Sequence, residues 1–480
     1  MTEYEPVIGI EVHAELLTNS KMFCSCPVEF GGEPNTRTCP VCLGLPGSLP
    51  VPNRRAIEFV IRASLALNCE VKEYSDFYRK NYFYPDLPKN YQISQYDNPI
   101  GRNGWIDITV DGTVKRIGIR RVHIEEDAGK LIHASVGNES LVDYNRGGLA
   151  LMEIVTEADI RSAEEAREYL VNLRAILTYI GVTNGKMEEG TLRCEPNISV
   201  RPKGTEKFGT KTELKNLNSF RAVYRGVEYE VKRQVEALQS GGRIIQETRR
   251  WDDDRGITIA MRTKEMEQEY RYFPDPDLVP MNFSAGLIEE QRSLLPELPQ
   301  ARKERFMKEF DLSAADAEML TSTRAMADYY EEAVGAYPDY KGISNWIMGD
   351  FTRMLNSAGI EIDASKVKPV DLAGLLKMIA DNVISGKMAK TVFEEMFNTG
   401  ASPKEIVKSR GMVQVSSETE LYPIIDQVIS ENPRIVQDFL GGKEKSFGFL
   451  VGQIMKYTQG RGNPQAVNQL LRKRLSETKG

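Results

Sequence analysis

The sequence has few of the side chains that carry out nucleophilic hydrolysis. It holds only three histidines (His13, His123 and His133), and it contains no G-x-S-x-G turn and no paired Cys–His signature. These are the arrangements that activate serine or cysteine for acyl-enzyme chemistry. Hydrolysis through an acyl-enzyme is therefore not expected of this chain.

Other familiar signals are missing too. There is no G-x-x-x-x-G-K-[ST] loop, so a bound nucleotide would not be held by a P-loop. No run of about 18 apolar residues occurs, and the first residues lack the basic-then-apolar pattern of an export signal. We expect a soluble, cytoplasmic protein with no membrane partner.

The charge is low overall and unevenly distributed. The 480 residues are 41% hydrophobic and 27% charged, as in globular proteins, with a formal net charge of -7. Residues 431–480 carry nine Lys or Arg against four Asp or Glu, a net charge of +5, which leaves -12 for the rest. Such a basic tail favours a local contact with a polyanion. A basic helix face that only aids solubility is the alternative.

Four of the six cysteines lie close together in the sequence, at Cys24, Cys26, Cys39 and Cys42. Two short-spaced pairs of this kind can converge on one tetrahedral Zn²⁺. A turn containing Gly31, Gly32, Pro34 and Asn35 would fold the second pair back onto the first. With four thiolates and no open position, the zinc would be structural; free buried thiols are the alternative.

The periodicity of the chain indicates an α+β protein of three domains. Short alternating strands dominate residues 1–290, as in the hairpin of residues 105–112, and one helix is predicted between Ser162 and Gly181. The absence of regular strand–helix alternation favours a largely antiparallel sheet. Residues 291–400 read as an all-α domain, residues 398–403 as a linker, and residues 404–480 as a small helical tail.

One early strand has an unusual polar face. Residues 7–16 alternate so that five apolar side chains share one face, while Gly9, Glu11, His13 and Glu15 share the other. Two carboxylates and an imidazole on one strand face suit chemistry or a cation. A solvated edge with harmless charges is the alternative.

Three more segments of the same domain are rich in acids: residues 120–127, 151–155 and 187–197. In the first, His123, Glu125 and Asp127 share one strand parity and Glu126 has the other. In the second, Glu153 lies inside an apolar run, where a carboxylate is costly unless paired or bound to a cation. If these strands are neighbours, the acids form an oxygen-rich cage. Separate ion pairs with nearby arginines are the alternative.

Such a cage favours Mg²⁺ bridging to a phosphate. A histidine ligand is less typical of Mg²⁺ and suits Mn²⁺ or Zn²⁺ better, unless His13 binds through water or orients a carboxylate.

Long motifs occur in one order along the chain: G-I-E-V-H-A-E-L, Y-F-Y-P-D-L-P-K-N-Y-Q-I-S-Q, H-I-E-E-D-A-G-K, M-E-E-G-T-L-R-C-E-P-N, T-E-L-K-N-L-N-S-F, Y-R-Y-F-P-D-P-D-L-V-P and F-L-V-G-Q-I-M-K. With these motifs the sequence resembles the B subunits of aspartyl/glutamyl-tRNA(Asn/Gln) amidotransferases over nearly its whole length. The resemblance implies a cradle-like N-terminal domain, a helical domain and a helical tail that contacts tRNA.

The resemblance also implies a function as part of a carbon–nitrogen ligase that uses glutamine as amide donor. ATP would phosphorylate the side-chain carboxylate of Glu-tRNA(Gln) or Asp-tRNA(Asn), and ammonia would then attack the acyl phosphate. The ammonia would come from glutamine through a partner amidase, the A subunit, in a heterotrimer completed by the small C subunit.

By motif match, the implied catalytic and magnesium residues are Glu11, His13, Glu126 and Glu153, with Glu125 next. Strand parity prefers Glu125 to Glu126, and a bulge at Arg120–Arg121 would reconcile the two. The implied substrate or nucleotide contacts are Lys80, Lys89, Lys215 and Asn216. The cysteine quartet is found in only some members of the family.

A rival hypothesis is a non-catalytic scaffold protein, stabilised by zinc, whose basic tail presents tRNA to an active partner. ATP cleavage that requires tRNA and responds to mutation in this chain would separate the two.

Overall fold

The computed structural model describes residues 2–29, 31–133, 139–263, 270–412, 415, 417–458 and 461–477. The chain divides into two compact units, one up to Pro299 and one from Gln300 onward. The first unit has a single large apolar core, and the second has two separate cores. None of the helices described is long and apolar enough to cross a membrane.

The first unit is built on a nine-stranded sheet with the order β14-β13-β12-β11-β1-β10-β7-β6-β2. All neighbours in it are antiparallel except β12 and β13. The predicted antiparallel α+β domain is therefore confirmed. The strands are β1 (Tyr4–Glu15), β2 (Glu70–Val71), β6 (Gly101–Val110), β7 (Thr113–Glu126), β10 (Ala150–Thr156), β11 (Leu192–Pro202), β12 (Thr212–Lys215), β13 (Glu247–Asp252) and β14 (Ile257–Thr263).

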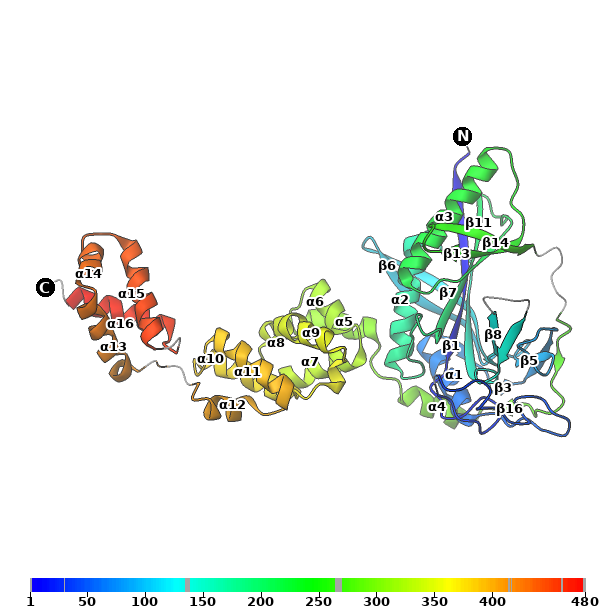
Figure 1. Cartoon of the computed structure of the whole chain (residues 1–480). Coiled ribbons are helices and arrows are strands. Elements are labelled where there is room, and N and C mark those ends of the chain that lie inside the picture. The colour runs from blue at the N-terminus through cyan, green and yellow to red at the C-terminus, as the bar shows by residue number, and fades with distance from the viewer. Residues whose placement is uncertain are drawn as a thin grey trace. The chain divides into compact units, whose positions relative to one another are not determined.

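Helices cover one face of this sheet, as Figure 1 shows for α2 and α3. The unit contains α1 (Arg54–Ala66), α2 (Ala163–Tyr179), α3 (Phe220–Gln239) and α4 (Ala285–Ser293). Ile8, Ile10 and Val12 of β1 are fully buried in the core on this side. The alternation of β1 therefore sends its polar residues to the opposite face of the sheet.

Local sequence signals explain two of these elements. Ser162 caps α2, the helix predicted between Ser162 and Gly181, by accepting a hydrogen bond from the Glu165 amide. Asp111 and Gly112 both have positive φ, the conformation of a two-residue hairpin turn, and they join β6 to β7.

Three small sheets complete the unit. They are β15-β4-β5, from Phe273–Pro274, Tyr78–Asn81 and Tyr91–Ser94; β16-β3, from Met281–Asn282 and Tyr74–Ser75; and β8-β9, from Lys130–His133 and Ser140–Asp143. The strand β5 is attached to the end of β7 by side chains. Gln92 donates to the Glu126 carbonyl oxygen at 2.8 Å, and Gln95 accepts from the Ile124 amide at 3.1 Å.

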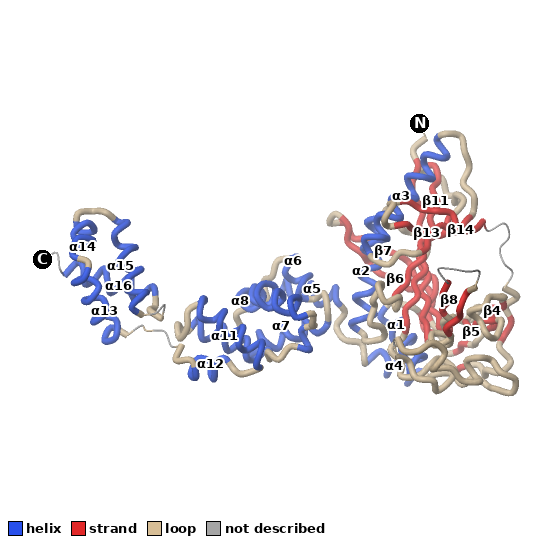
Figure 2. Tube along the Cα trace, viewed as in Figure 1, coloured by secondary structure: helices blue, strands red, loops and turns tan. Residues whose placement is uncertain are grey.

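The second unit is helical throughout its described residues, as Figure 2 shows. Its first core is formed by α5 (Pro299–Glu309), α6 (Ala314–Leu320), α7 (Arg324–Ala336), α8 (Tyr340–Trp346), η1 (Ile347–Phe351), α9 (Thr352–Ala358), η2 (Ile362–Ala364), α10 (Pro369–Ala380), α11 (Gly386–Thr399) and α12 (Pro403–Ser409). Its second core is formed by α13 (Glu418–Glu431), α14 (Pro433–Leu440), α15 (Glu444–Tyr457) and α16 (Pro464–Glu477).

Two boundaries differ from those expected from the sequence. Leu295 and Leu298 pack on the core of the first unit, so that unit extends past residue 290. Residues 398–403 are not an interdomain linker, because Ile406 and Val407 of α12 are buried in the first helical core. The turn at residues 400–402 instead reverses the chain within one helical domain.

Candidate active site

The polar face of β1 lies in the middle of the large sheet, between β10 and β11. His13 is opposite Glu153 of β10 on one side and Arg193 of β11 on the other. On β10, Glu153 is in turn opposite His123 of β7. Residues directly opposite in antiparallel strands point to the same face, so three adjacent strands direct these side chains together.

The resulting cluster contains two imidazoles and two carboxylates in contact. His13 Nε2 lies 3.3 Å from Glu125 Oε1 and 3.4 Å from Glu153 Oε2. His123 Nε2 lies 3.3 Å from the same Glu153 oxygen and 3.6 Å from Glu125 Oε2. Ser94 Oγ donates to Glu125 Oε2 at 3.2 Å. His13, Glu125 and Glu153 each offer one ligand atom, and these atoms all lie within 4.8 Å of one another.

Burial and mutual pairing shift the proton affinities of the cluster. Burial disfavours the charged imidazolium of His13, but its hydrogen bonds to Glu125 and Glu153 outweigh that cost and raise its pKa well above the usual value. Burial likewise opposes ionisation of both carboxylates, yet the two histidines lower the pKa of each. Ionised carboxylates beside an imidazole are a donor set that suits a divalent cation, whose charge would replace that of the protons.

Glu11 lies two residues along β1 from His13, on the same face. Burial raises its pKa, and Glu153 and Glu195 raise it further. Asn197 donates to Glu11 Oε1 at 3.0 Å, and Glu195 lies opposite Glu11 on β11. Glu11 thus extends the acidic face but is not one of the three residues with closely spaced ligand atoms. Glu11 lines a cavity of about 450 Å³, and Arg120 and Lys211 line the same cavity.

Glu126 is directed away from this cluster. Its carboxylate accepts from Lys89 Nζ at 2.5 and 2.6 Å and from the Ile93 amide at 2.9 Å. A register shift does occur beside Arg120, but the strand alternates regularly beyond it, so Glu125 keeps the face of His123. The parity argument therefore identifies the carboxylate that meets His13, and the bulge does not bring Glu126 to it.

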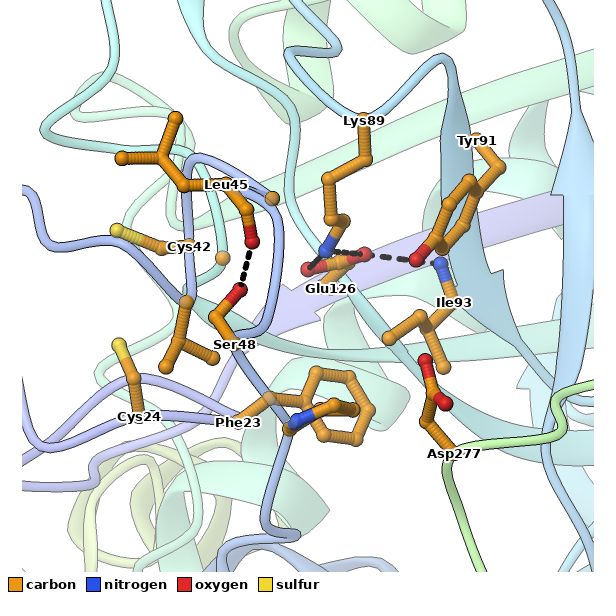
Figure 3. A pocket seen from close by; sticks show the side chains of 14 residues that line it. Phe23, Cys24, Cys42, Leu45, Ser48, Lys89, Tyr91, Ile93, Glu126 and Asp277 are labelled. Carbon is orange, nitrogen blue, oxygen red and sulfur yellow. Dashed lines mark hydrogen bonds and ion pairs between the residues drawn. The ribbon is translucent and has the colours of Figure 1, made fainter.

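The Lys89–Glu126 pair lines a separate cavity of about 200 Å³. Figure 3 shows the pair on one side of this cavity and Cys24 and Cys42 on the other. Both charged side chains are nearly buried, with exposed fractions of 9% and 4%. An ion pair held this way fixes the end of β7 next to Glu125.

The four predicted zinc ligands come together in the loop between β1 and α1. The sulfur atoms of Cys24, Cys26, Cys39 and Cys42 all lie within 4.8 Å of one another. A tetrahedral site with Zn–S bonds of about 2.3 Å has sulfurs about 3.8 Å apart, so the quartet fits Zn²⁺ with little adjustment. Gly31, Gly32 and Asn35 have positive φ in the turn between the two cysteine pairs, as predicted.

One sulfur of the quartet favours the thiolate that a metal requires. The hydrogen bond from Cys24 lowers the pKa of Cys42 to about 5, aided by the Cys39 amide and by Lys21, against the opposing effect of burial. The Lys21 ammonium lies 3.9 Å from Cys42 Sγ and donates to the Tyr144 carbonyl oxygen at 3.2 Å. A buried cation at this position offsets the negative charge of a four-thiolate site.

Comparison with known proteins identifies the family. Residues 6–289 match the model described as GatB/GatE catalytic domain, and residues 328–475 match the GatB domain. The chain belongs to the GatB/GatE family. It is similar to the B subunit of the aspartyl/glutamyl-tRNA(Asn/Gln) amidotransferase from Carboxydothermus hydrogenoformans, with 57% identity over 480 residues, which cover 99% of this chain and 100% of the relative.

Other relatives agree. The protein of the same name from Moorella thermoacetica is 57% identical over 475 residues, and that from Brevibacillus brevis is 54% identical over 476 residues. Both alignments cover all of the relative and at least 98% of this chain. The acidic cluster and the cysteine quartet both lie within the range that matches the catalytic domain.

Three of the four predicted substrate or nucleotide contacts lie beside carboxylates, each in a different part of the unit. Lys80 is close enough to Glu125 and Glu153 that these acids raise its pKa, against the opposing effect of burial. Lys89 pairs with Glu126. Lys215 is farther along the sheet, with Nζ 2.6 Å from Glu195 and 2.9 Å from Glu213.

Asn216 has a different role from the one expected. Its φ is +67°, and its amide nitrogen donates to the Trp251 carbonyl oxygen at 2.9 Å. These features hold the turn after β12, so the structure gives Asn216 a structural hydrogen bond and not a position on the acidic face.

His123 is the site residue that the sequence pattern did not place in the ligand set. It is 3% exposed and touches both Glu125 and Glu153, while its Nδ1 atom is buried without a hydrogen-bond partner among the described residues. The signal was present, because His123 shares strand parity with Glu125. Only the pairing of β7 with β10 shows that it meets Glu153.

Proposed function

We propose that the chain is the component of a tRNA-dependent amidotransferase that activates the substrate. The reaction converts Glu-tRNA(Gln), Asp-tRNA(Asn) or both to the amide-bearing tRNA at the cost of ATP. The observation that carries the proposal is the convergence of His13, Glu125 and Glu153 from three adjacent strands within the matched catalytic domain. The names of the relatives support the substrate class.

The chemistry requires activation because a carboxylate is a poor electrophile. Transfer of the γ-phosphoryl group of ATP to a carboxylate oxygen gives an acyl phosphate and ADP. Attack of ammonia on the acyl carbon then expels inorganic phosphate and leaves the amide. The first step brings several negative charges together, so a site for it needs positive charge close by.

We propose Glu125, Glu153 and His13 as ligands of a divalent cation, with Glu11, on the same face of β1 as His13, acting through water. Carboxylate oxygens favour Mg²⁺, and the imidazole would also suit Mn²⁺. When bound, the cation would neutralise phosphate charge. Lys80 supplies a second positive charge beside the same carboxylates. Glu126 is proposed to hold the end of β7 through Lys89, which replaces the catalytic role implied by the motif match.

The remaining parts of the complex follow from what this chain lacks. It carries no recognised machinery for glutamine hydrolysis, so ammonia is proposed to come from a partner amidase, the A subunit, with the small C subunit completing the heterotrimer. The basic helices at the end of the chain are proposed to contact tRNA. Zn²⁺ bound by the cysteine quartet is proposed to be structural, and stoichiometric zinc retained by Cys39→Ser protein would refute that site.

The experiment uses the complete heterotrimer with Glu153→Gln in this chain. We expect amide formation on the misacylated tRNA to fall at least 100-fold, while glutamine hydrolysis by the partner persists. Glu3→Gln is the matched control, because Glu3 precedes the same central strand β1 but is 72% exposed.

The non-catalytic scaffold is the competing function. It predicts that tRNA-dependent ADP formation does not respond to Glu153→Gln. Amide formation at the wild-type rate by that variant would reject the active-site proposal.

A further inference from the structure

A group of tyrosines next to the acidic cluster has no part in the chemistry proposed above. The small sheet β15-β4-β5 supplies it. In this sheet Arg79 is opposite Phe273, and Lys80 is opposite Gln92. Tyr270 and Tyr272 come just before β15 and Tyr82 just after β4, and the Asn81 amide donates to the Tyr270 carbonyl oxygen at 2.9 Å. Within the sheet itself, Lys80, Gln92 and Ser94 share one face.

That face is turned toward the acidic cluster. Gln92 and Ser94 of β5 belong to it, and they bond to the Glu126 carbonyl oxygen and to the Glu125 carboxylate. Tyr96 follows Ser94 with the same parity. Burial raises the pKa of Tyr272 to about 12, against the lowering effect of Lys80.

We call Tyr82, Tyr96, Tyr270 and Tyr272 the tyrosine platform. The rings of Tyr96 and Tyr272 are stacked, with centroids 4.4 Å apart and planes 13° apart. Tyr270 meets Tyr272 and Tyr82 edge to face, at 6.1 and 5.9 Å. Tyr96 is 55% exposed, so much of the stacked pair is open to a ligand.

The platform also contains a cation. Lys80 Nζ lies 4.9 Å from the centre of the Tyr270 ring and 5.9 Å from that of Tyr82. A group of aromatic rings with one ring exposed and an ammonium group beside the others is a combination that suits unpaired nucleotides, since bases stack on rings and a cation meets phosphate.

We propose that the tyrosine platform binds the unpaired 3′-terminal nucleoside of the substrate RNA by stacking its base on the Tyr96–Tyr272 pair. This rests on the proposed function. The aminoacyl group is bonded covalently to that nucleoside, so a site that holds the side-chain carboxylate beside the acidic cluster must hold the base one aminoacyl length away. The platform is the aromatic surface bonded to that site through β5. Phe83 and Tyr84, which follow Tyr82 in the sequence, are 86% and 47% exposed.

The test compares two RNAs on the intact heterotrimer: a tRNA(Gln) transcript with its 3′-terminal adenosine and the same transcript without it. We expect removal of the adenosine to weaken binding to the wild-type complex about tenfold. The double variant Tyr96→Ala/Tyr272→Ala should bind the intact RNA about tenfold more weakly and show no further loss on removal. Tyr96→Phe/Tyr272→Phe should behave as wild type, because the rings remain.

Tyr74→Ala is the matched control, since Tyr74 is 44% exposed in the same unit but lies on β3. An equal penalty for removing the adenosine in wild type and in the alanine double variant would overturn the proposal. A second result would also overturn the proposal: the alanine double variant fails to assemble into the heterotrimer, yet its RNA binding still weakens when the adenosine is removed. That result would assign the platform to a protein partner. Failure of the proposed function can be told apart from failure of the platform proposal, because in the former case the wild-type complex forms no ADP in response to misacylated RNA.

Discussion

At the scale of single residues, two neighbouring glutamates at the end of β7 have opposite surroundings. Glu125 contacts His13, His123 and Ser94, all on the face that carries the acidic cluster. Glu126 contacts Lys89 and the Ile93 amide. A shift of one residue along a strand exchanges the two faces, so chemically identical side chains acquire different partners.

This difference predicts an exchange of phenotypes. Glu125→Gln should reduce tRNA-dependent ADP formation at least 100-fold, because it removes a carboxylate from the proposed cation site. Glu126→Gln should leave ADP formation within about threefold of wild type but lower the free energy of unfolding by about 3 kcal/mol, because it leaves Lys89 buried without its partner.

Both variants are measured for ADP release and for chemical denaturation. If Glu126→Gln abolishes ADP formation while Glu125→Gln does not, the assignment of the two glutamates made from the structure is wrong.

At the scale of elements, the alternation within β1 and the parity of residues 120–127 were sufficient to predict which side chains share a face. The register that brings those faces together was not predictable in the same way. His13 and Glu153 are 140 residues apart in the sequence and meet through the pairing of β1 with β10. His123 meets Glu153 through a second pairing, that of β7 with β10. Strand order depends on the whole core, whereas alternation is local. For the same reason His123 could not be assigned to the site from sequence.

A buried network at the sheet edge predicts how this element responds to pH. Glu230 of α3 is fully buried and accepts hydrogen bonds from Arg233, Gln234 and Thr212. Although burial opposes ionisation, these bonds hold the pKa of Glu230 below its usual value of about 4.5. Ionised Glu230 therefore stabilises the folded state fully above pH 4.5, and this stabilisation is lost as pH falls through the lowered pKa.

Glu230→Gln should accordingly lower the free energy of unfolding by about 2 kcal/mol at pH 7, and by progressively less below pH 4.5. Urea denaturation at pH 7 and pH 4 measures both values. Glu228→Gln, an exposed change on the same helix, should cost less than about 0.5 kcal/mol. If the loss of unfolding free energy caused by Glu230→Gln is larger at pH 4 than at pH 7, the lowered pKa assigned to Glu230 is wrong.

At the scale of the whole molecule, composition and periodicity predicted a sheet-based unit followed by helices, and both are confirmed. The boundary near residue 400 was placed too early because a Gly-Ala-Ser-Pro turn has the composition of a linker. Only the packing of Ile406 and Val407 shows that α12 belongs to the preceding helical core. A truncation that removes the tail without damaging this core should therefore end after Met412.

That truncation tests the proposed role of the basic tail. The truncation removes residues 413–480, and all nine Lys or Arg of that segment lie in residues 431–480, which carry a net charge of +5. It should therefore weaken tRNA binding and flatten the slope of log affinity against log salt by up to about 4. Filter binding at several salt concentrations measures the slope, with circular dichroism as the check that the remaining helices fold. An unchanged slope would show that the tail makes no phosphate contacts.

The central claim is that His13, Glu125 and Glu153 bind a divalent cation, and Mn²⁺ binding measured by electron paramagnetic resonance tests it most directly. With the heterotrimer and ATP present, we expect one Mn²⁺ ion whose affinity falls about 10- to 100-fold or more in Glu153→Gln and is unchanged in Glu3→Gln. Equal Mn²⁺ affinity in wild type, Glu153→Gln and His13→Ala would contradict the claim.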